Sequence, residues 1–260
     1  MNKEEQINYI KNKFILYKTN GSKRLIRHDF FKNINTELQS YLLGFYVADG
    51  SIDEKRKTFR IHLSEKDHEL VDLYKSIISP EARTYKILEH KTTGRNGKEI
   101  TAHESYGVDI SSSILVNDLI DLNYGYKKTY SNLLLPEIDD NLIRHFIRGY
   151  FDGDGCITGW MNYEKGKKDR FRYSFDICGK TKSLLNDILI YFRIYNINVN
   201  MSYISRDDMF RIKTSSKEEV KKIYHFLYDN SNFYLSRKFN KFNYYVNTEV
   251  NQLIADHRNA

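Results

Sequence analysis

The chain contains one long internal repeat, which limits the folds it can adopt. Residues 41–50 read YLLGFYVADG and residues 146–155 read FIRGYFDGDG. Both are apolar, helix-compatible runs with glycine at the fourth place and Asp-Gly at the end. The matched acids, Asp49 and Asp154, lie too far apart along the chain for a solenoid repeat. The spacing favours two pseudo-symmetric half-domains.

The similarity between the copies continues downstream. Residues 59–77 and 173–191 each read as an alternating strand, a polar break and an amphipathic helix. Residues 106–120 and 210–224 each read as a strand, two serines and a helix. Each copy therefore predicts helix, hairpin, helix, hairpin, helix, which is an α+β fold made of two αββαββα half-domains with antiparallel sheets.

The predicted boundaries follow from these blocks. Residues 38–135 form the first half-domain and residues 136–245 the second. Residues 1–37 are an N-terminal extension and residues 246–260 a C-terminal tail. Both end segments are expected either to extend a binding surface or to cover the fold.

Small residues recur at matched places in the two motif helices. Gly44 and Ala48 are four residues apart, as are Gly149 and Gly153, so each pair shares one helix face. Glycine inside a helix costs about 1 kcal/mol relative to alanine, which indicates a packing reason for keeping it. We expect the two strips to pack against each other along a pseudo-two-fold axis.

The two copies of the repeat each place an acid at the predicted C-terminus of the motif helix. Gly50 and Gly155 follow the acids, and the pattern predicts that they adopt the left-handed conformation that often ends a helix. Asp49 and Asp154 would face the negative pole of the helix dipole and would lie near each other. This arrangement favours a divalent cation with oxygen ligands, most simply Mg²⁺, with Mn²⁺ or Ca²⁺ as substitutes.

Composition limits the class of partner. The formal net charge is +7 and the sequence pI is about 9.1, which favours a polyanionic partner. No apolar run is long enough for a membrane span, and the charged N-terminus does not resemble a secretory signal. The two cysteines, Cys156 and Cys178, are too few for a disulfide framework. We expect an intracellular protein with a polyanionic partner.

The two motifs resemble those of the LAGLIDADG homing endonucleases in their monomeric, two-motif form. The first motif aligns over residues 42–50 and the second over residues 147–155, and the likeness extends over roughly residues 38–245. Val47 replaces the first acid of the family motif, whereas Asp152 retains it. Arg148 stands where a small residue is usual, which predicts either a looser helix contact there or an outward-pointing side chain.

The resemblance implies a specific activity. A saddle of two antiparallel sheets would lie in the major groove of double-stranded DNA, with the motif helices at its centre. Metal held by Asp49 and Asp154 would support hydrolysis of both strands at a long asymmetric site, leaving 3′ overhangs and promoting mobility of an intron or other host element. The carbonyl groups of Ala48 and Gly153 are further candidate ligands by resemblance.

Basic residues near the end of each copy are additional catalytic candidates. The segment GYKKT (125–129) parallels LSRKF (235–239), which places Lys128 opposite Lys238. Both match a late basic residue of the family that lies near the scissile phosphates. We assign them to phosphate stabilisation or to organisation of water.

Strand alternation separates core positions from candidate DNA contacts. Outward-facing positions are expected to read base edges, with arginine favouring guanine, or to set the phosphate register. The candidate DNA-binding residues are Ser51, Asp53, Lys55, Arg60, His62, Lys66, Arg170, Arg172, Ser174, Lys180, Arg211 and Lys213.

Two alternatives use the same fold. The first is a maturase, which binds intron RNA and assists splicing with cleavage lost or retained. The second is a DNA-binding regulator without catalysis, for which loss of one or both acids is expected. Because Asp49 and Asp154 are both present, a metal-dependent endonuclease is favoured over either alternative.

Overall fold

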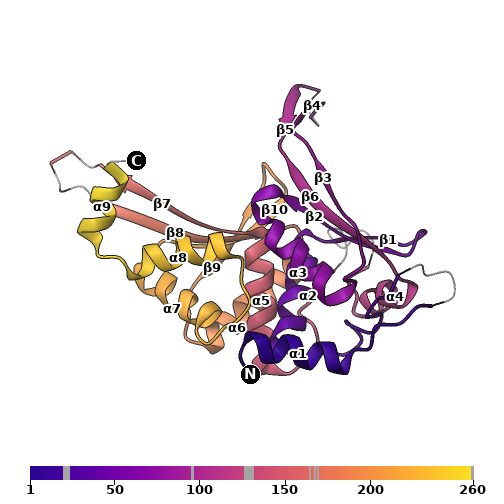
Figure 1. Cartoon of the computed structure of the whole chain (residues 1–260). Coiled ribbons are helices and arrows are strands. Elements are labelled where there is room, and N and C mark those ends of the chain that lie inside the picture. The colour runs from indigo at the N-terminus through magenta and orange to yellow at the C-terminus, as the bar shows by residue number, and fades with distance from the viewer. Residues whose placement is uncertain are drawn as a thin grey trace.

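Two copies of one α+β unit lie side by side around a central pair of helices (Figure 1). The computed structural model describes residues 1–19, 24–94, 97–125, 132–163, 165, 166, 168 and 170–258. In the first copy the elements are α2 (Glu37–Asp49), β1 (Ser51–Asp53), β2 (Thr58–Ser64), the short helix η1 (Glu65–Asp67), α3 (His68–Ile78), β3 (Thr84–Ile87), β4 (His90–Thr93), β5 (Glu99–Ala102), β6 (Ser105–Ser111) and α4 (Ser113–Asp121).

The second copy repeats the order helix, hairpin, helix, hairpin, helix and adds α8 (Ser236–Asn247). Its elements are α5 (Asp140–Asp154), β7 (Gly155–Asn162), β8 (Arg170–Gly179), α6 (Lys182–Ile194), β9 (Asn200–Ile204), β10 (Met209–Thr214), α7 (Lys217–Tyr228) and α8. The predicted fold class, two αββαββα half-domains with antiparallel sheets, is confirmed.

The two main sheets have the same topology. The first has the strand order β1-β2-β6-β3 and the second β7-β8-β10-β9, and all neighbours pair antiparallel. Ser112 and Ser216, from the matched Ser-Ser blocks, cap helices α4 and α7 by accepting hydrogen bonds from backbone N–H groups. The same turn chemistry therefore ends the second hairpin of each copy.

The strand register corrects one part of the sequence alignment. Ile52 pairs with Phe59 in the first sheet, and its counterpart Ile157 pairs with Phe175 in the second. Phe59 is therefore equivalent to Phe175. The alignment of residues 59–77 with residues 173–191 had predicted that Phe59 is equivalent to Tyr173. The difference arises because η1 adds residues between strand and helix in the first copy only.

Each sheet has one covered face and one open face. Phe59, Ile61 and Val108 are fully buried on the covered face of the first sheet, as are Phe175 and Ile177 in the second. The helices lie on this side of both sheets, below them in Figure 1. The alternate residues of each strand therefore face the side away from the helices.

The two halves are elongated by different hairpins. In the first half, strands β3 and β6 continue into the two-stranded β4–β5 sheet, which projects at the top of Figure 1. In the second half, β7 and β8 form the long hairpin, and α9 (Val250–Arg258) packs against it and buries Leu253. At the N-terminus, α1 (Lys3–Lys13) buries Ile10 against the core. Helices α1 and α9 thus both bury apolar side chains against the fold.

Helices α2 and α5 touch backbone to backbone. A Cβ atom placed on Gly44 would lie 2.0 Å from the carbonyl oxygen of Phe146, and one on Gly149 would lie 2.0 Å from that of Tyr41. Further along, a Cβ on Gly153 would lie 2.3 Å from the Cβ of Ala48. The strips of small residues therefore face each other, with no room for a larger side chain.

This contact predicts that alanine destabilises the protein at either glycine. Gly44→Ala or Gly149→Ala should raise helix propensity by about 1 kcal/mol. The clash with a backbone carbonyl should outweigh this gain and lower the free energy of unfolding by about 3 kcal/mol or more. Urea unfolding would measure the loss. Asn186→Ala, at an exposed position of α6, is the control and should be neutral or slightly stabilising; similar behaviour of all three variants would contradict the packing argument.

Candidate metal and DNA site

The two motif acids converge where the paired helices end. Asp49 and Asp154 are the last residues of α2 and α5, and both are exposed. A Cβ on Gly153 would lie 3.0 Å from Asp49 Oδ2, so the acid of one helix touches the residue beside the acid of the other. Burial raises the pKa of Tyr150 well above its usual value, and Asp154 and Asp49 both add to this shift. One tyrosine thus lies within electrostatic reach of both carboxylates.

The glycines after the acids have a different role from the predicted one. Gly50 has φ −76° and Gly155 has φ −88°, so both are extended and the prediction of a left-handed conformation was wrong. A Cβ on Gly50 would lie 2.2 Å from the ring of Tyr46, and one on Gly155 would lie 2.1 Å from the ring of Phe151. Glycine is needed because an aromatic ring four residues earlier lies over it as the chain passes from helix to strand.

Asp152, the other acid of the second motif, is buried and does not face the metal site. Its carboxylate accepts hydrogen bonds from Tyr41 (2.9 Å), Tyr228 (3.0 Å) and the N–H of Leu235 (2.7 Å). Burial raises the pKa of Asp152, and the hydrogen bonds from Leu235, Tyr41 and Tyr228 oppose that rise. Asp152 therefore ties α5 to α2 and to the segment before α8.

Arg148 points into the protein, so both sequence expectations for it were wrong. It is fully buried, and the helix contact beside it is close. Its guanidinium donates to Glu37 (2.8 Å) and to the carbonyl groups of Leu227 (2.9 Å) and Phe233 (2.8 Å). Arg148 thereby joins the start of α2 to the chain between α7 and α8.

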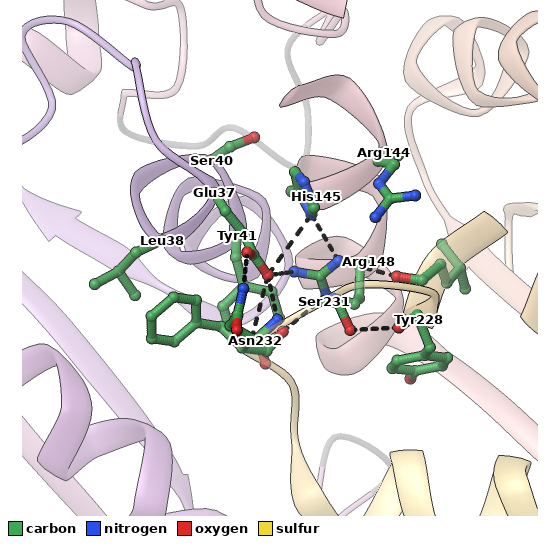
Figure 2. Close-up of polar contacts among 12 residues, drawn as sticks. Glu37, Leu38, Ser40, Tyr41, Arg144, His145, Arg148, Tyr228, Ser231 and Asn232 are labelled. Atoms are coloured by element: carbon green, nitrogen blue, oxygen red, sulfur yellow. Dashed lines mark hydrogen bonds and ion pairs between the residues drawn. The ribbon is translucent and has the colours of Figure 1, made fainter. Parts of the chain in front are cut away.

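His145 and Glu37 both contact the Arg148 guanidinium, one as a neutral acceptor and the other as a carboxylate (Figure 2). His145 Nδ1 lies 2.7 Å from Arg148 Nη1; because the guanidinium can only donate, the imidazole accepts and is neutral. Burial, followed by Arg148, lowers the pKa of His145 to about 3. Burial tends to raise the pKa of Glu37, but Arg148, Asn232 and Gln6 outweigh it and the pKa is lowered.

The ammonium group of Lys238 is committed to the end of α5. It donates to the carbonyl groups of Phe151 (2.9 Å), Gly153 (2.8 Å) and Gly155 (2.6 Å), and the residue is 7% exposed. A lysine has three donors, and all are used here. Contact with a phosphate would require it to leave these carbonyls. Lys128, its counterpart, lies outside the described residues.

The first turn of α8 also binds the first copy. Arg237 forms an ion pair with Asp67 in η1, and Ser236 donates to Glu69 of α3 (2.7 Å from the hydroxyl). These contacts were missed from the sequence because they join positions that no local pattern relates. They fix residues of the second copy beside the helix end that carries Asp49.

The candidate DNA-binding residues differ in exposure. Ser51 and Asp53 lie on β1, whereas Lys55 lies in the turn after it. Lys66 lies within η1 and Lys180 directly after β8, so these lysines do not occupy equivalent positions. Ser174 is 3% exposed and does not present its hydroxyl to solvent. The exposed candidates are Ser51, Lys55, His62, Lys66, Arg170 and Lys213, and the half-buried ones are Asp53, Arg60, Arg172, Lys180 and Arg211.

Acidic residues beside two of these arginines were not anticipated. Asp109 on β6 binds Arg60, and Asp176 on β8 binds Arg211. Burial, followed by the hydrogen bond to Asp176, raises the pKa of Cys178 to about 12, so this thiol is protonated at neutral pH. The alternation of β8 indicates that Asp176 faces outward, but its partner follows only from the pairing of β8 with β10.

The donor set suits a hard cation that shares its ligands with DNA. Among the described residues, no group of three or more His, Cys, Asp or Glu side chains gathers to hold a metal ion. Asp49 and Asp154 each supply a carboxylate, and the carbonyl of Gly153 already accepts from Lys238. A six-coordinate cation would therefore need water or phosphate oxygens in addition.

Comparison with known proteins identifies the class of this fold. Residues 36–117 match the family model of the LAGLIDADG-like domain. The fold is shared with the LAGLIDADG meganuclease I-CpaMI bound to uncleaved DNA, with TM-score 0.54 and 16% identity over 80% of this chain and 90% of that one. The resemblance inferred from the two motifs is thus confirmed.

The form of the protein within that class is the single-chain, duplicated one. I-SmaMI bound to cleaved DNA has TM-score 0.52 and 14% identity, covering 81% of this chain and 87% of that one. I-AabMI bound to uncleaved DNA has TM-score 0.52 and 13% identity, covering 79% and 89%. At these identities the likeness establishes the fold alone. The search of curated sequences returned no match. Within the described part of the chain, no helix has the length and apolar character of a membrane span.

The buried ion pair yields a stability prediction with a defined pH dependence. Arg148→Met leaves the buried Glu37 carboxylate without its cation and should cost about 3–5 kcal/mol of unfolding free energy at pH 7. The lowered pKa of Glu37 stabilises the fold above the ordinary glutamate pKa, and this stabilisation is lost as pH falls through the folded value. The deficit of the variant relative to the native protein should therefore shrink on acidification.

Urea unfolding across a pH series would measure this deficit. The double variant Glu37→Gln/Arg148→Met is the control and should recover part of the loss at pH 7, because it removes the unpaired charge. A deficit that grew as the pH fell would show that Glu37 is not the group responsible.

Proposed function

We propose that this protein is a homing endonuclease: a divalent-metal-dependent enzyme that hydrolyses both strands of a long asymmetric DNA duplex. It would leave 3′ overhangs and promote the mobility of its intron or host element. The observation that carries this proposal is the convergence of Asp49 and Asp154 at the ends of two helices in backbone contact. A hydrolase that cuts two strands needs two acidic sites close together. The packing of α2 against α5 holds the two acids near each other at the helix ends.

Each acid is assigned to one strand. Asp49 and Asp154 would hold the metal, Mg²⁺ in the simplest case, with the carbonyl groups of Ala48 and Gly153 as additional candidate ligands. A bound divalent cation would neutralise charge on the phosphate and lower the pKa of a coordinated water. The protein's own contribution is to keep two exposed carboxylates side by side against their mutual repulsion, through the close contact of α2 and α5.

The lysine from the second copy is assigned a positioning role. Because Lys238 donates to the carbonyls of Phe151, Gly153 and Gly155, it would act on phosphate only through the helix end it holds. Assignment of Lys128 and Lys238 to phosphate stabilisation or to organisation of water remains a prediction, and direct contact of Lys238 with a phosphate would require its ammonium to leave these carbonyls. Loss of the ammonium at Lys238 would leave buried carbonyls unsatisfied and shift the backbone next to Asp154.

The open faces of the sheets are assigned to DNA. They carry the exposed strand residues Ser51, His62 and Lys213 and extend along the β7–β8 hairpin to Arg170 and Arg172. The net charge of +7 supports a polyanionic partner. We propose that the protein acts as a monomer, since one chain supplies both copies of the motif. Intron RNA is the alternative partner and would be recognised by binding without duplex cleavage.

The assignment of one acid to each strand predicts nicking variants. Asp49→Asn and Asp154→Asn should each abolish cutting of at least one strand by Mg²⁺-supplied protein, because a neutral amide is a far weaker metal ligand. Binding of the duplex should be retained. End-labelling the two strands separately would measure each cut, with native protein as reference and Asp121→Asn, an exposed aspartate at the end of α4, as the control. Normal cutting by both motif variants would refute the site.

The sparse protein ligands predict that metal binding depends on DNA. Mn²⁺ titrated into the protein alone should bind weakly, and a cleavage-resistant duplex should tighten binding about tenfold or more, because phosphate oxygens complete the coordination. Electron paramagnetic resonance of free Mn²⁺ would follow binding without requiring turnover. Asp49→Asn/Asp154→Asn should remove the gain. Tight binding to the protein alone, unaffected by the double variant, would place the cation elsewhere.

A further inference from the structure

Each sheet presents one arginine that is fixed by an aspartate on its open face. In the first half, Arg60 Nε donates to Asp109 Oδ1 (3.0 Å) and Arg60 Nη2 donates to Asp109 Oδ2 (2.9 Å). In the second half, Arg211 Nε donates to Asp176 Oδ2 (2.6 Å), and a second contact forms through Nη2. In both cases the aspartate occupies the same edge of the guanidinium, the edge formed by Nε and one terminal nitrogen.

A third side chain fixes each aspartate. The Tyr85 hydroxyl donates to Asp109 Oδ1 (3.1 Å), and the Cys178 thiol donates to Asp176 Oδ1 (3.2 Å). These three-residue groups, Arg60–Asp109–Tyr85 and Arg211–Asp176–Cys178, we call the two arginine clamps. The ion pair between Arg206 and Asp207 differs, because the Arg206 side chain is 88% exposed in a turn and, among the described residues, no third side chain binds the Asp207 carboxylate.

Both clamps lie close to the motif acids. Arg60 pairs with Ser51, which is two residues beyond Asp49, and Arg60 also pairs with Asp109. Arg211 pairs with Cys178, next to Ile177, the partner of Gly155. Neighbouring strands are about 4.8 Å apart. Each arginine is therefore within one or two strands of the helix end where cleavage is proposed.

The chemistry of the clamps favours a base over a phosphate. An arginine–aspartate pair carries no net charge, so it contributes little to phosphate attraction. Its outer edge, formed by the two terminal nitrogens, still carries paired donors, and side-chain exposures of 38% for Arg60 and 34% for Arg211 keep it accessible. Two parallel donors on a fixed plane match the O6 and N7 acceptors of guanine in the major groove.

We infer that Arg60 and Arg211 each read a guanine, one in each half of the DNA target, beside the scissile phosphates. The inference rests on the proposed function and adds the base that these residues select. The clamps are not related by the duplication, because the arginine lies on β2 and its aspartate on β6 in the first half, whereas the aspartate lies on β8 and the arginine on β10 in the second. The two guanines should therefore lie at unequal distances from the centre of the target.

Selection from a randomised duplex library tests this inference. Sites would be selected in two ways: by binding in Ca²⁺ and by cleavage in Mg²⁺. The native protein should require guanine at one position in each half. Arg60→Gln should reduce the preference at one of these positions by about tenfold or more, and Arg211→Gln should do so at the other only. Each variant thus serves as the internal control of the other.

The aspartates provide the sharper part of the test. Asp109→Asn keeps Arg60 but removes the charge that orients it, so preference should relax at the same position that Arg60→Gln affects. Arg206→Gln is the matched control and should leave both guanine positions unchanged. Thermal unfolding of each variant would show whether it remains folded; a variant that does not would be replaced by Arg60→Lys or Arg211→Lys, which keep the charge but lose the paired donors.

The outcomes separate the inference from the proposed function. Guanine selection by binding without any cleavage in Mg²⁺ would leave the inference standing and refute the nuclease. Cleavage with unchanged base preference in both arginine variants, or a loss of affinity spread evenly over all positions, would overturn the inference and leave the nuclease intact. Failure of the native protein to select any duplex by either route would overturn both.

Discussion

The close approach of α2 and α5 is the contact on which the rest of the structure depends. Glycine at positions 44 and 149 allows the backbone of one helix to touch the carbonyl groups of the other. This contact sets the separation of the helix ends and therefore the separation of Asp49 and Asp154. It also fixes the angle between the sheets, since β1 and β7 leave the helices directly after the acids. One packing constraint thus determines both the site and the orientation of the surfaces proposed to bind DNA.

The backbone is nearly symmetric, but the polar interactions at the interface are not. Arg148 and Asp152 of α5 have Leu43 and Val47 as their counterparts in α2, so one flank of the helix pair is apolar and the other is a buried hydrogen-bond network. Removing one member of such a network is costly, because a buried charge loses its partner. The network binds residues 227–238 to both halves. A duplicated chain has thereby acquired a connection that specifies how its two halves fit.

The sequence predicted those features that depend on local pattern or on repetition. The α+β class, the element order and the packing of the two strips of small residues against each other follow from periodicity and matched spacing. It failed where the outcome depends on a distant partner. Arg148 was expected either to loosen the helix contact or to point outward, because nothing in its neighbourhood shows Glu37, which is far away in sequence and supplies the compensating charge. The extended conformation of Gly50 was missed because it depends on how the Tyr46 ring packs. The arginine clamps required the strand register, which no sequence pattern determined.

The first turn of α8 explains how two acids are tolerated at adjacent helix ends. A carboxylate at a helix C-terminus is unfavourable, and a second one nearby adds repulsion. Lys238 offsets the dipole of α5 by donating to three carbonyls around Asp154. Arg237 forms an ion pair with Asp67, and the hydrogen bond to Asp67 is the main reason why its pKa is raised, although burial opposes the rise. Asp152 and Asp49 add to the rise, so Arg237 lies within electrostatic reach of these two acids. One stretch of chain thus supplies a cation to each helix end without covering either exposed carboxylate. The two acids can remain close together and accessible before any metal or nucleic acid is bound.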